Sequence, residues 1–360
     1  MWAAKNGHSG VVKSLLERGD IDPNTTDTRC GQTPLLWAAE NGRVGVVKLL
    51  LEREDTNPNT ADTGFSQTSL SWAAQNRHEG VVKLLLARGD TDPNTTVTFY
   101  GQTLLSWAAA YGHVRVVKLL LEREDTDPNT ADTGWSSRPS RTPLLWAVEK
   151  RHEGVVKLLL ERKDIDPNIA DTDGQTPLLW AAEHGHEDVV KLLLERGDID
   201  PNLADTKCSR TPLLWAAEND HEGIVKLLLE RGDIDPNTAD TISGQTPLSR
   251  AAENGHSGVV KLLLERDDVN PDILNLKGET ALELAALGDH TKVVELLSVP
   301  KPSLPLPVEI NRVPEHPPSP DPSDLLQSSS PSTPPARPSL LEPLPPDTRP
   351  FLKKRRLAPS

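Results

Sequence analysis

Apolar residues along the chain come in two short blocks separated by a polar turn, and this pair of blocks recurs many times. In one copy, "TPLLWAA" is followed by the polar "ENGR" and then by "VGVVKLLL". Thr33 and Pro34 suit the N-cap and the first position of a helix, which Asn41-Gly42 then ends. The apolar residues of the second block share one broad helical face. The pattern therefore predicts two short helices, the second running from about Val44 to Arg53.

The interval between copies is nearly constant, and this periodicity is the main structural signal of the sequence. The copies open at Thr33, Thr68, Thr103, Thr142, Thr176, Thr211, Thr246 and Thr280. These threonines are 34 or 35 residues apart except for one interval of 39, and an incomplete copy opens the chain at Met1. Isolated helices shorter than roughly 12–15 residues are marginal in water. The helix pairs must therefore stack, and we expect an all-α solenoid of about nine units over residues 1–299.

Three phrases of the repeat carry a resemblance to a known family. Thr-Pro-Leu stands intact in five copies, a Gly-His turn follows as at Gly255-His256, and Asp-Pro-Asn closes the unit. The repeat resembles the ankyrin repeat, a β-turn plus two antiparallel helices with a T-P-L-H-x-A signature. Its closing phrase is similar to that of tandem arrays from filamentous fungi. The signature His is Leu or Ser here, as at Leu36 and Ser71, so those copies rely more on apolar packing. The resemblance implies a protein-binding array whose first helices line the concave side.

Charge separates the repeats from the rest of the chain. The sequence has 53 acidic and 39 basic residues, and residues 299–360 hold 6 and 8 of these, which leaves 47 and 31 in the array. An array with a net charge of −16 favours a basic protein partner and disfavours nucleic acid and anionic membranes. No apolar run reaches the roughly 18 residues of a membrane-spanning helix. Cys30 and Cys208 lie five repeats apart, too far to form a disulfide, which favours a reducing compartment. We expect a monomer that resides in the cytoplasm or, as the alternative, in the nucleus.

Nothing in the sequence resembles a catalytic or metal-binding constellation. Eight of the ten histidines recur at the turn between the two helices, one in each unit except the second, which has Arg43: His8, His78, His113, His152, His186, His221, His256 and His290. One imidazole per layer does not provide the three or four ligands that zinc requires. The carboxylates also recur in register, whereas a catalytic set is normally unique within a chain. We therefore expect no cofactor, no metal and no enzyme activity.

Seven of the eight tryptophans occupy a single position of the repeat: Trp2, Trp37, Trp72, Trp107, Trp146, Trp180 and Trp215. One interpretation is that each indole packs between neighbouring units, with its N–H at the wet edge. The alternative is a ladder of aromatic rings that binds a ligand. We expect packing, because an identical residue in seven layers suits stacking better than selective recognition.

Departures from the repeat are better candidates for partner binding. Aromatic residues occur on three consecutive turn tips and once at the end of a first helix: Phe65, Phe99, Tyr100, Trp135 and Tyr111. Exposed aromatic clusters are typical of interaction surfaces, although random drift in loops is the alternative. Four glutamates in register at the ends of first helices extend this candidate surface: Glu149, Glu183, Glu218 and Glu253.

Residues 300–360 form a second region of different composition. Residues 299–360 contain 18 of the 32 prolines and many serines, which predicts a disordered segment with polyproline character. The segment ends in Lys353, Lys354, Arg355 and Arg356, which fit either a nuclear-import signal or a solvated run of charge. The sequence therefore predicts a non-enzymatic scaffold. The alternatives are a nuclear regulator controlled through this tail and the C-terminal recognition array of a larger multidomain protein.

Overall fold

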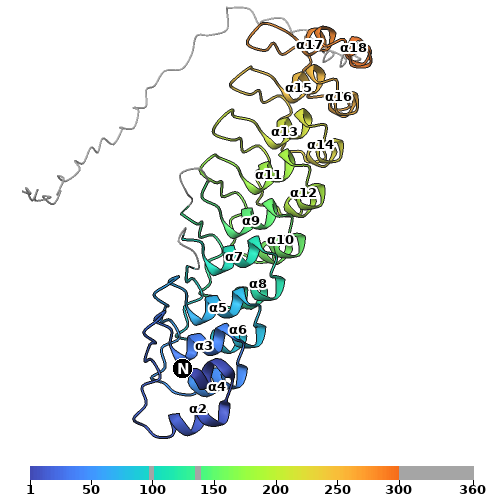
Figure 1. Cartoon of the computed structure of the whole chain (residues 1–360). Coiled ribbons are helices and arrows are strands. Elements are labelled where there is room, and N and C mark those ends of the chain that lie inside the picture. Colours follow the sequence, from blue (N-terminus) through green and yellow to red (C-terminus); the bar gives the residue numbers. More distant parts are fainter. Residues whose placement is uncertain (97–100, 134–138, 300–360) are drawn as a thin grey trace, which may run out of the picture. The chain divides into compact units, whose positions relative to one another are not determined.

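The computed structural model describes residues 1–96, 101–133 and 139–299, and these residues form nine pairs of short helices (Figure 1). We number the units 1 to 9 in chain order. Their first helices are α1 (Trp2–Asn6), α3 (Pro34–Glu40), α5 (Ser69–Gln75), α7 (Leu104–Ala110), α9 (Pro143–Glu149), α11 (Pro177–Glu183), α13 (Pro212–Glu218), α15 (Pro247–Glu253) and α17 (Ala281–Leu287). Their second helices are α2 (Ser9–Leu16), α4 (Val44–Leu51), α6 (Glu79–Leu86), α8 (Val114–Leu121), α10 (Glu153–Leu160), α12 (Glu187–Leu194), α14 (Glu222–Leu229), α16 (Ser257–Leu264) and α18 (Thr291–Ser298). The all-α repeat architecture is confirmed, and the second helix of unit 2 ends at Leu51, two residues before its expected end.

A threonine cap starts every first helix except α1. Thr33 has an extended backbone, and its side chain accepts a hydrogen bond from the backbone N–H of Leu36 at 3.2 Å. In α17 the cap is reciprocal, because Glu283 also accepts from the backbone N–H of Thr280. α1 has no side-chain cap. The cap satisfies one of the free N–H groups at a helix start, which matters in helices this short.

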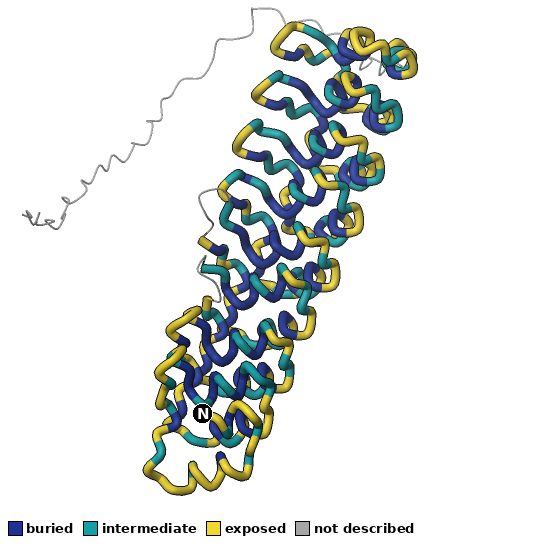
Figure 2. The backbone as a smooth tube through the Cα atoms, viewed as in Figure 1, coloured by how far each residue is buried: buried dark blue, intermediate teal, exposed yellow. Residues whose placement is uncertain are grey.

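The units stack in sequence order through both of their helices. Each first helix packs on the next first helix and each second helix on the next second helix, as α7 and α8 do on α9 and α10. The buried residues lie inside this double row (Figure 2). Ala38 and Ala39 are fully buried, and their small side chains let successive first helices approach closely. Because each helix pair buries its apolar face only against its neighbours, the array forms one continuous core.

Arginines at the ends of the second helices tie each unit to the preceding one. Arg123 forms a two-pronged ion pair with Asp125. Its Nη1 also donates to the carbonyl groups of Leu86 and Arg88 in the preceding unit, both at 2.9 Å. These carbonyls stand at the end of α6, where a helix leaves acceptors without internal partners. Equivalent bonds to the preceding unit are made by Arg53, Arg88, Arg162, Arg196, Arg231 and Arg266.

The Asp-Pro-Asn phrase makes a second link between units. The side-chain amide of Asn94 donates to the Asp125 carbonyl at 2.7 Å, and its oxygen accepts from the backbone N–H of Asp127 at 2.9 Å. The same donation to the next unit is made by Asn24, Asn59, Asn129, Asn168, Asn202 and Asn237. The recurrence of this phrase is thus explained by backbone contacts between units.

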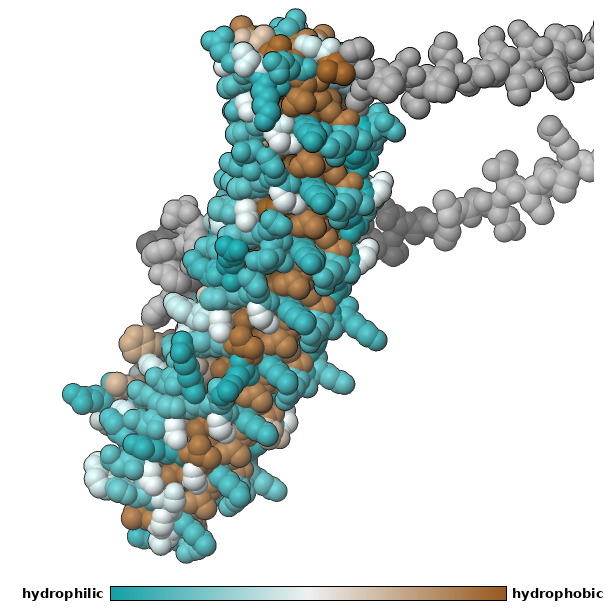
Figure 3. Space-filling view, turned by 90° about the vertical axis from the view of Figure 1, so that its right-hand side faces the viewer, coloured by the Kyte–Doolittle hydropathy of each residue, from teal (hydrophilic) through white to brown (hydrophobic). Residues whose placement is uncertain are grey.

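The outer side of the second helices carries a band of hydrophobic side chains flanked by hydrophilic ones (Figure 3). Half-buried leucines such as Leu84 and Leu119 pack on the core here, beside the exposed Lys83 and Lys118. No helix among the described residues is long and apolar enough to cross a membrane.

Candidate functional site

Most of the recurring tryptophans are held by an aspartate of the preceding hairpin. The indole N–H of Trp72 donates to Asp62 at 2.7 Å, and Asp62 is itself 4% exposed. Trp37, Trp146 and Trp215 make the same bond in their own units, to Asp27, Asp132 and Asp205. In unit 8, Arg250 replaces the tryptophan and binds Asp240 at 2.8 Å. These bonds lie inside single units, whereas the prediction concerned packing between units. Contact with the core is shown for Trp146, which is buried, and for Trp107 and Trp180, which are partly buried. Trp2 is the exception, since it is 71% exposed.

Two tryptophans, in units 4 and 6, lack this aspartate bond. Val97 stands ten residues before Trp107, where units 2, 3, 7 and 8 have Asp, so no carboxylate is present at that position. Asp171 stands nine residues before Trp180 rather than ten, and the Trp180 indole N–H is buried without a hydrogen-bond partner in the described part of the chain.

Each of these two rings instead contacts a second ring one helical turn further on. The centroids of Trp107 and Tyr111 are 4.9 Å apart. Trp180 and His184 stack at 4.3 Å with their planes 17° apart. These ring pairs are specific to the middle of the array, and Tyr111 is 61% exposed.

Tyr111 and His184 belong to a run of three consecutive departures from the repeat. The residue four positions after the tryptophan is Asn in units 2, 3 and 7, where its side chain donates to the tryptophan carbonyl at 2.9–3.0 Å. In units 4, 5 and 6 this residue is Tyr111, Lys150 and His184. Lys150 Nζ lies 5.9 Å from the Trp146 ring, and Arg141 lies between the rings of Trp146 and Trp180 at 5.2 and 4.9 Å. We call Tyr111, Lys150 and His184 the middle surface.

The four glutamates expected to attract a basic partner are mostly engaged within the array. Glu149 forms ion pairs with Arg141 and Lys150, Glu218 pairs with Arg210 at 2.7 Å, and Glu253 pairs with Arg250 at 3.3 Å. Burial raises the pKa of Glu183, which disfavours its charged form. The expected acidic row is therefore largely neutralised by neighbouring arginines, which the spacing of the glutamates alone did not reveal.

Only one of the turn-tip aromatics can be placed. Phe65 is 56% exposed, and its ring meets Trp72 edge-on with centroids 6.0 Å apart. Phe99, Tyr100 and Trp135 lie outside the described residues, as do Lys353, Lys354, Arg355 and Arg356. The shared aromatic patch and the import signal therefore stay predictions.

The turn histidines link successive units. In five of them Nε2 lies 2.9–3.1 Å from a carbonyl oxygen at the end of the preceding first helix. His113 differs, because its Nε2 accepts a hydrogen bond from Arg77 Nε at 3.0 Å. Burial, followed by the charge of Arg77, lowers the pKa of His113, so its neutral form is favoured.

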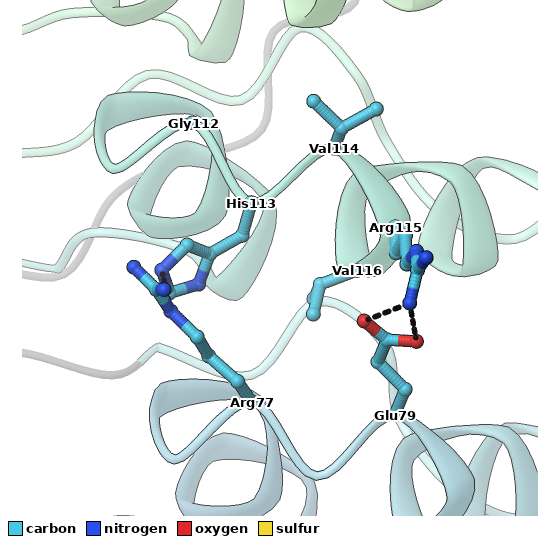
Figure 4. A pocket seen from close by; sticks show the side chains of 7 residues that line it. All are labelled: Arg77, Glu79, Gly112, His113, Val114, Arg115 and Val116. Carbon is cyan, nitrogen blue, oxygen red and sulfur yellow. Dashed lines mark hydrogen bonds and ion pairs between the residues drawn. The ribbon is translucent and has the colours of Figure 1, made fainter.

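A shallow pocket lies between the turns of units 3 and 4 (Figure 4). The Arg77–His113 pair borders one side, and the ion pair of Arg115 with Glu79, at 3.1 Å, borders the other. Its volume of about 210 Å³ is below the roughly 300 Å³ at which small-molecule sites begin, so it suits a single side chain better than a free ligand. Among the described residues, no group of three or more His, Cys, Asp or Glu could hold a metal ion.

Comparison with known families agrees with this architecture. A family model for ankyrin repeats matches residues 1–97, 54–132, 90–171, 162–240 and 233–303. The chain belongs to the ankyrin-repeat family. Ankyrin repeats are generally protein–protein interaction modules, and ankyrin-repeat proteins are typically non-enzymatic. No curated protein matches the chain.

Sequence reasoning missed several residues of this ankyrin site. Arg77, Lys150 and His184 were not selected as candidates, because polar residues are common at surface positions. Tyr111 was selected because it is aromatic. Aligning the units position by position could have identified them, because each of these residues replaces the Gly or Asn of other units.

Proposed function

We propose that this ankyrin array is a monomeric, non-enzymatic scaffold that binds a protein partner through the middle surface. The observation that carries the proposal is the run of three departures at one structural position in three adjacent units. In units 1, 2, 3 and 7 this position is an asparagine whose side chain bonds the backbone of its own helix. Tyr111 and Lys150 replace that side chain by an exposed ring and an exposed cation, and His184, which keeps a contact of 3.0 Å to the Trp180 carbonyl, adds an exposed imidazole.

The chemistry of the middle surface suits recognition of a protein. Aromatic rings are enriched at the centres of interfaces, where they provide large contact areas at low entropic cost. Tyr111 supplies such a ring, and Trp107 beneath it restricts its movement. Successive first helices are about 8–10 Å apart, so three units span the width of a standard interface.

The test replaces the three residues of the middle surface with the asparagine that other units have at this position. The triple variant Tyr111→Asn, Lys150→Asn, His184→Asn should keep or raise thermal stability, since asparagine bonds the helix end in other units. The wild-type protein is used to capture binding proteins from extracts, and these are identified. Each is then titrated against the purified wild-type protein and the purified triple variant. We expect a partner whose affinity drops at least roughly tenfold in the variant, a loss of about 1.4 kcal/mol.

The matched control places alanine at the same position of other units, as Asn41→Ala, Asn76→Ala, Asn219→Ala. This control should retain the partner even if its stability falls. If the middle-surface variant binds every captured partner as tightly as wild type does, the proposed surface is wrong.

Two further proposals come from the sequence. The first is a turn-tip patch, for which replacing Phe65, Tyr100 and Trp135 together by Ser should reduce partner binding without loss of stability. The second is a nuclear role through Lys353–Arg356, supported by a basic cluster in a region otherwise weakly charged. A basic partner remains compatible with the net charge of the array but has less support, because three of the four glutamates are already paired.

A further inference from the structure

The turns between the first and second helices change charge sharply along the array. In units 2 to 5 these turns comprise residues 41–45, 76–80, 111–115 and 150–154 and contain five Lys or Arg but only two carboxylates. In units 6 and 7 they comprise residues 184–188 and 219–223 and contain four carboxylates and no Lys or Arg. Residues 101–121 contain no Asp or Glu at all. A chain that is acidic overall thus carries a basic edge over four adjacent units.

The cations of this edge are available to a partner. Arg43, Arg77, Arg115 and Arg151 are all exposed, and we call these four residues the basic turn edge. Within the described residues, the side-chain hydrogen bonds of Arg43 and Arg77 go to uncharged groups, the Lys5 carbonyl and His113. Arg151 forms an exposed ion pair with Asp188 at 3.4 Å. The side chain of Arg115 is 79% exposed although it pairs with Glu79. Surface pairs of this kind contribute little, so a partner carboxylate can compete for the guanidinium group.

Apolar side chains are interspersed with these arginines. Val44 and Val114 open the second helices of units 2 and 4 and are 46% and 44% exposed, where other units have Ser, Glu or Thr. Tyr111 lies at the same edge, with its ring centroid 6.3 Å from that of His113. A mixture of cations and exposed apolar groups favours a protein segment over a polyanion that offers charge alone.

The pocket of Figure 4 marks one point of contact along this edge. Arg77, Glu79, His113 and Arg115 line it together with Val114. An entering carboxylate therefore meets two guanidinium groups and an apolar wall, and it must displace Glu79 from Arg115. A second shallow groove begins at Glu79 and Arg115 and continues between α6 and α8 past Lys83 and Lys118. The two depressions share Glu79 and Arg115. Their four cationic side chains, Arg77, Arg115, Lys83 and Lys118, outnumber the carboxylates of Glu79 and Glu122.

We propose that the basic turn edge binds an extended acidic segment of a protein partner, with one carboxylate seated between Arg77 and Arg115. This inference rests on the proposed function as a protein-binding array and specifies the chemistry of the partner. Neighbouring helices lie about 8–10 Å apart and an extended chain advances about 3.3 Å per residue. The segment therefore presents one acidic residue per unit when every third residue is acidic.

The probe is a labelled 13-residue peptide with Glu at every third position and Val or Ser between, titrated by fluorescence anisotropy against the full chain. Binding should weaken at least tenfold in the double variant Arg77→Gly, Arg115→Gln. Glycine suits position 77, because Arg77 has a φ of 58°. The control Lys226→Gln, Lys261→Gln removes the same charge from α14 and α16 and should leave the affinity unchanged.

Two further ligands test the specificity of the edge. A peptide with the same number of glutamates clustered at one end should bind at least tenfold more weakly, as should single-stranded RNA of equal charge. Equal binding of the clustered peptide, tighter binding of RNA, or an unaffected double variant would each overturn the inference. In that case the proposed function would still hold if a natural partner binds the chain with an affinity that depends on Tyr111, Lys150 and His184.

Discussion

Asp62, which holds Trp72 in unit 3, should contribute more to stability than Asp171, the aspartate at the equivalent hairpin position of unit 6, which does not bond Trp180. Asp62 accepts from the Trp72 indole N–H at 2.7 Å and from the backbone N–H of Phe65 at 2.6 Å, using both carboxylate oxygens. In Asp62→Asn the side chain keeps its shape but has only one oxygen. Its amide nitrogen then faces one of these two donors, so one hydrogen bond is lost and two N–H groups meet.

The magnitude follows from the chemistry of that bond. A hydrogen bond to a charged group contributes about 1.5–3 kcal/mol, and leaving a buried donor unpaired costs a similar amount. Asp62 is 4% exposed, so water cannot easily replace the carboxylate. We expect Asp62→Asn to lower the free energy of unfolding by about 1.5–3 kcal/mol.

Asp171→Asn is the matched control at the equivalent hairpin position. Asp171 Oδ1 accepts from the backbone N–H groups of Asp173 and Gln175, both at 2.9 Å, and an asparagine oxygen can do the same. Oδ2 has no hydrogen-bond donor among the described residues, and Arg141 Nε is 3.9 Å away. Burial raises the pKa of Asp171, so the ionised carboxylate opposes folding at neutral pH. This substitution should therefore cost less than half as much as Asp62→Asn.

Guanidinium denaturation followed by tryptophan fluorescence measures both losses, with Trp72 as a reporter beside Asp62. The comparison also has a pH arm. Because the folded pKa of Asp171 lies above the ordinary value of 3.8, the folded state binds its proton more tightly, and stability relative to Asp171→Asn grows as pH falls toward that pKa. Equal losses for the two variants at neutral pH would refute the reasoning, as would no loss in Asp62→Asn.

Three other predictions use the same measurements or simple imaging. Trp146→Ala should lower the free energy of unfolding by about 3–5 kcal/mol, because Trp146 is 1% exposed, whereas Trp2→Ala should change it by less than about 0.5 kcal/mol. Since burial and then Arg77 lower the pKa of His113 below 6.5, stability should be complete above this pH and decline below it, and His113→Asn should reduce that decline. Changing Lys353–Arg356 to Ala should move a tagged chain from nucleus to cytoplasm; no shift, or no nuclear signal in wild type, would contradict an import role.

The fold could be predicted from the sequence because its determinants are local and repeated. A Thr-Pro pair starts the first helix in units 2, 5, 6, 7 and 8, and a second apolar block needs a neighbour to cover it. The packing of most recurring tryptophans was also predictable from their shared position. Their aspartate partners were not, because the hairpin that folds Asp62 back onto Trp72 is only visible in three dimensions.

The candidate site was harder to predict from the sequence, again because its contacts form only in three dimensions. Glu149 and Glu218 look like free acids in the sequence, but the residue eight positions earlier is Arg141 or Arg210, and the hairpin brings the two charges together. Whether a charge is free depends on the neighbour that the fold provides. The net charge of an array therefore does not identify the partner of a particular surface.

In a stacked array, a residue that recurs in every unit is usually needed by the adjoining unit. Arg123 bonds the end of α6, and Asn94 bonds the loop that follows α8, so altering either would disturb two layers at once. A residue that departs from the repeat can make a contact of its own, as Arg77 does with His113 of the next unit. Tyr111 and Arg77 are departures of this kind, and each leaves its helix pair intact while changing the exposed edge. Selection for binding can therefore act on these positions without altering the packing, which is why we place the partner over units 2 to 6.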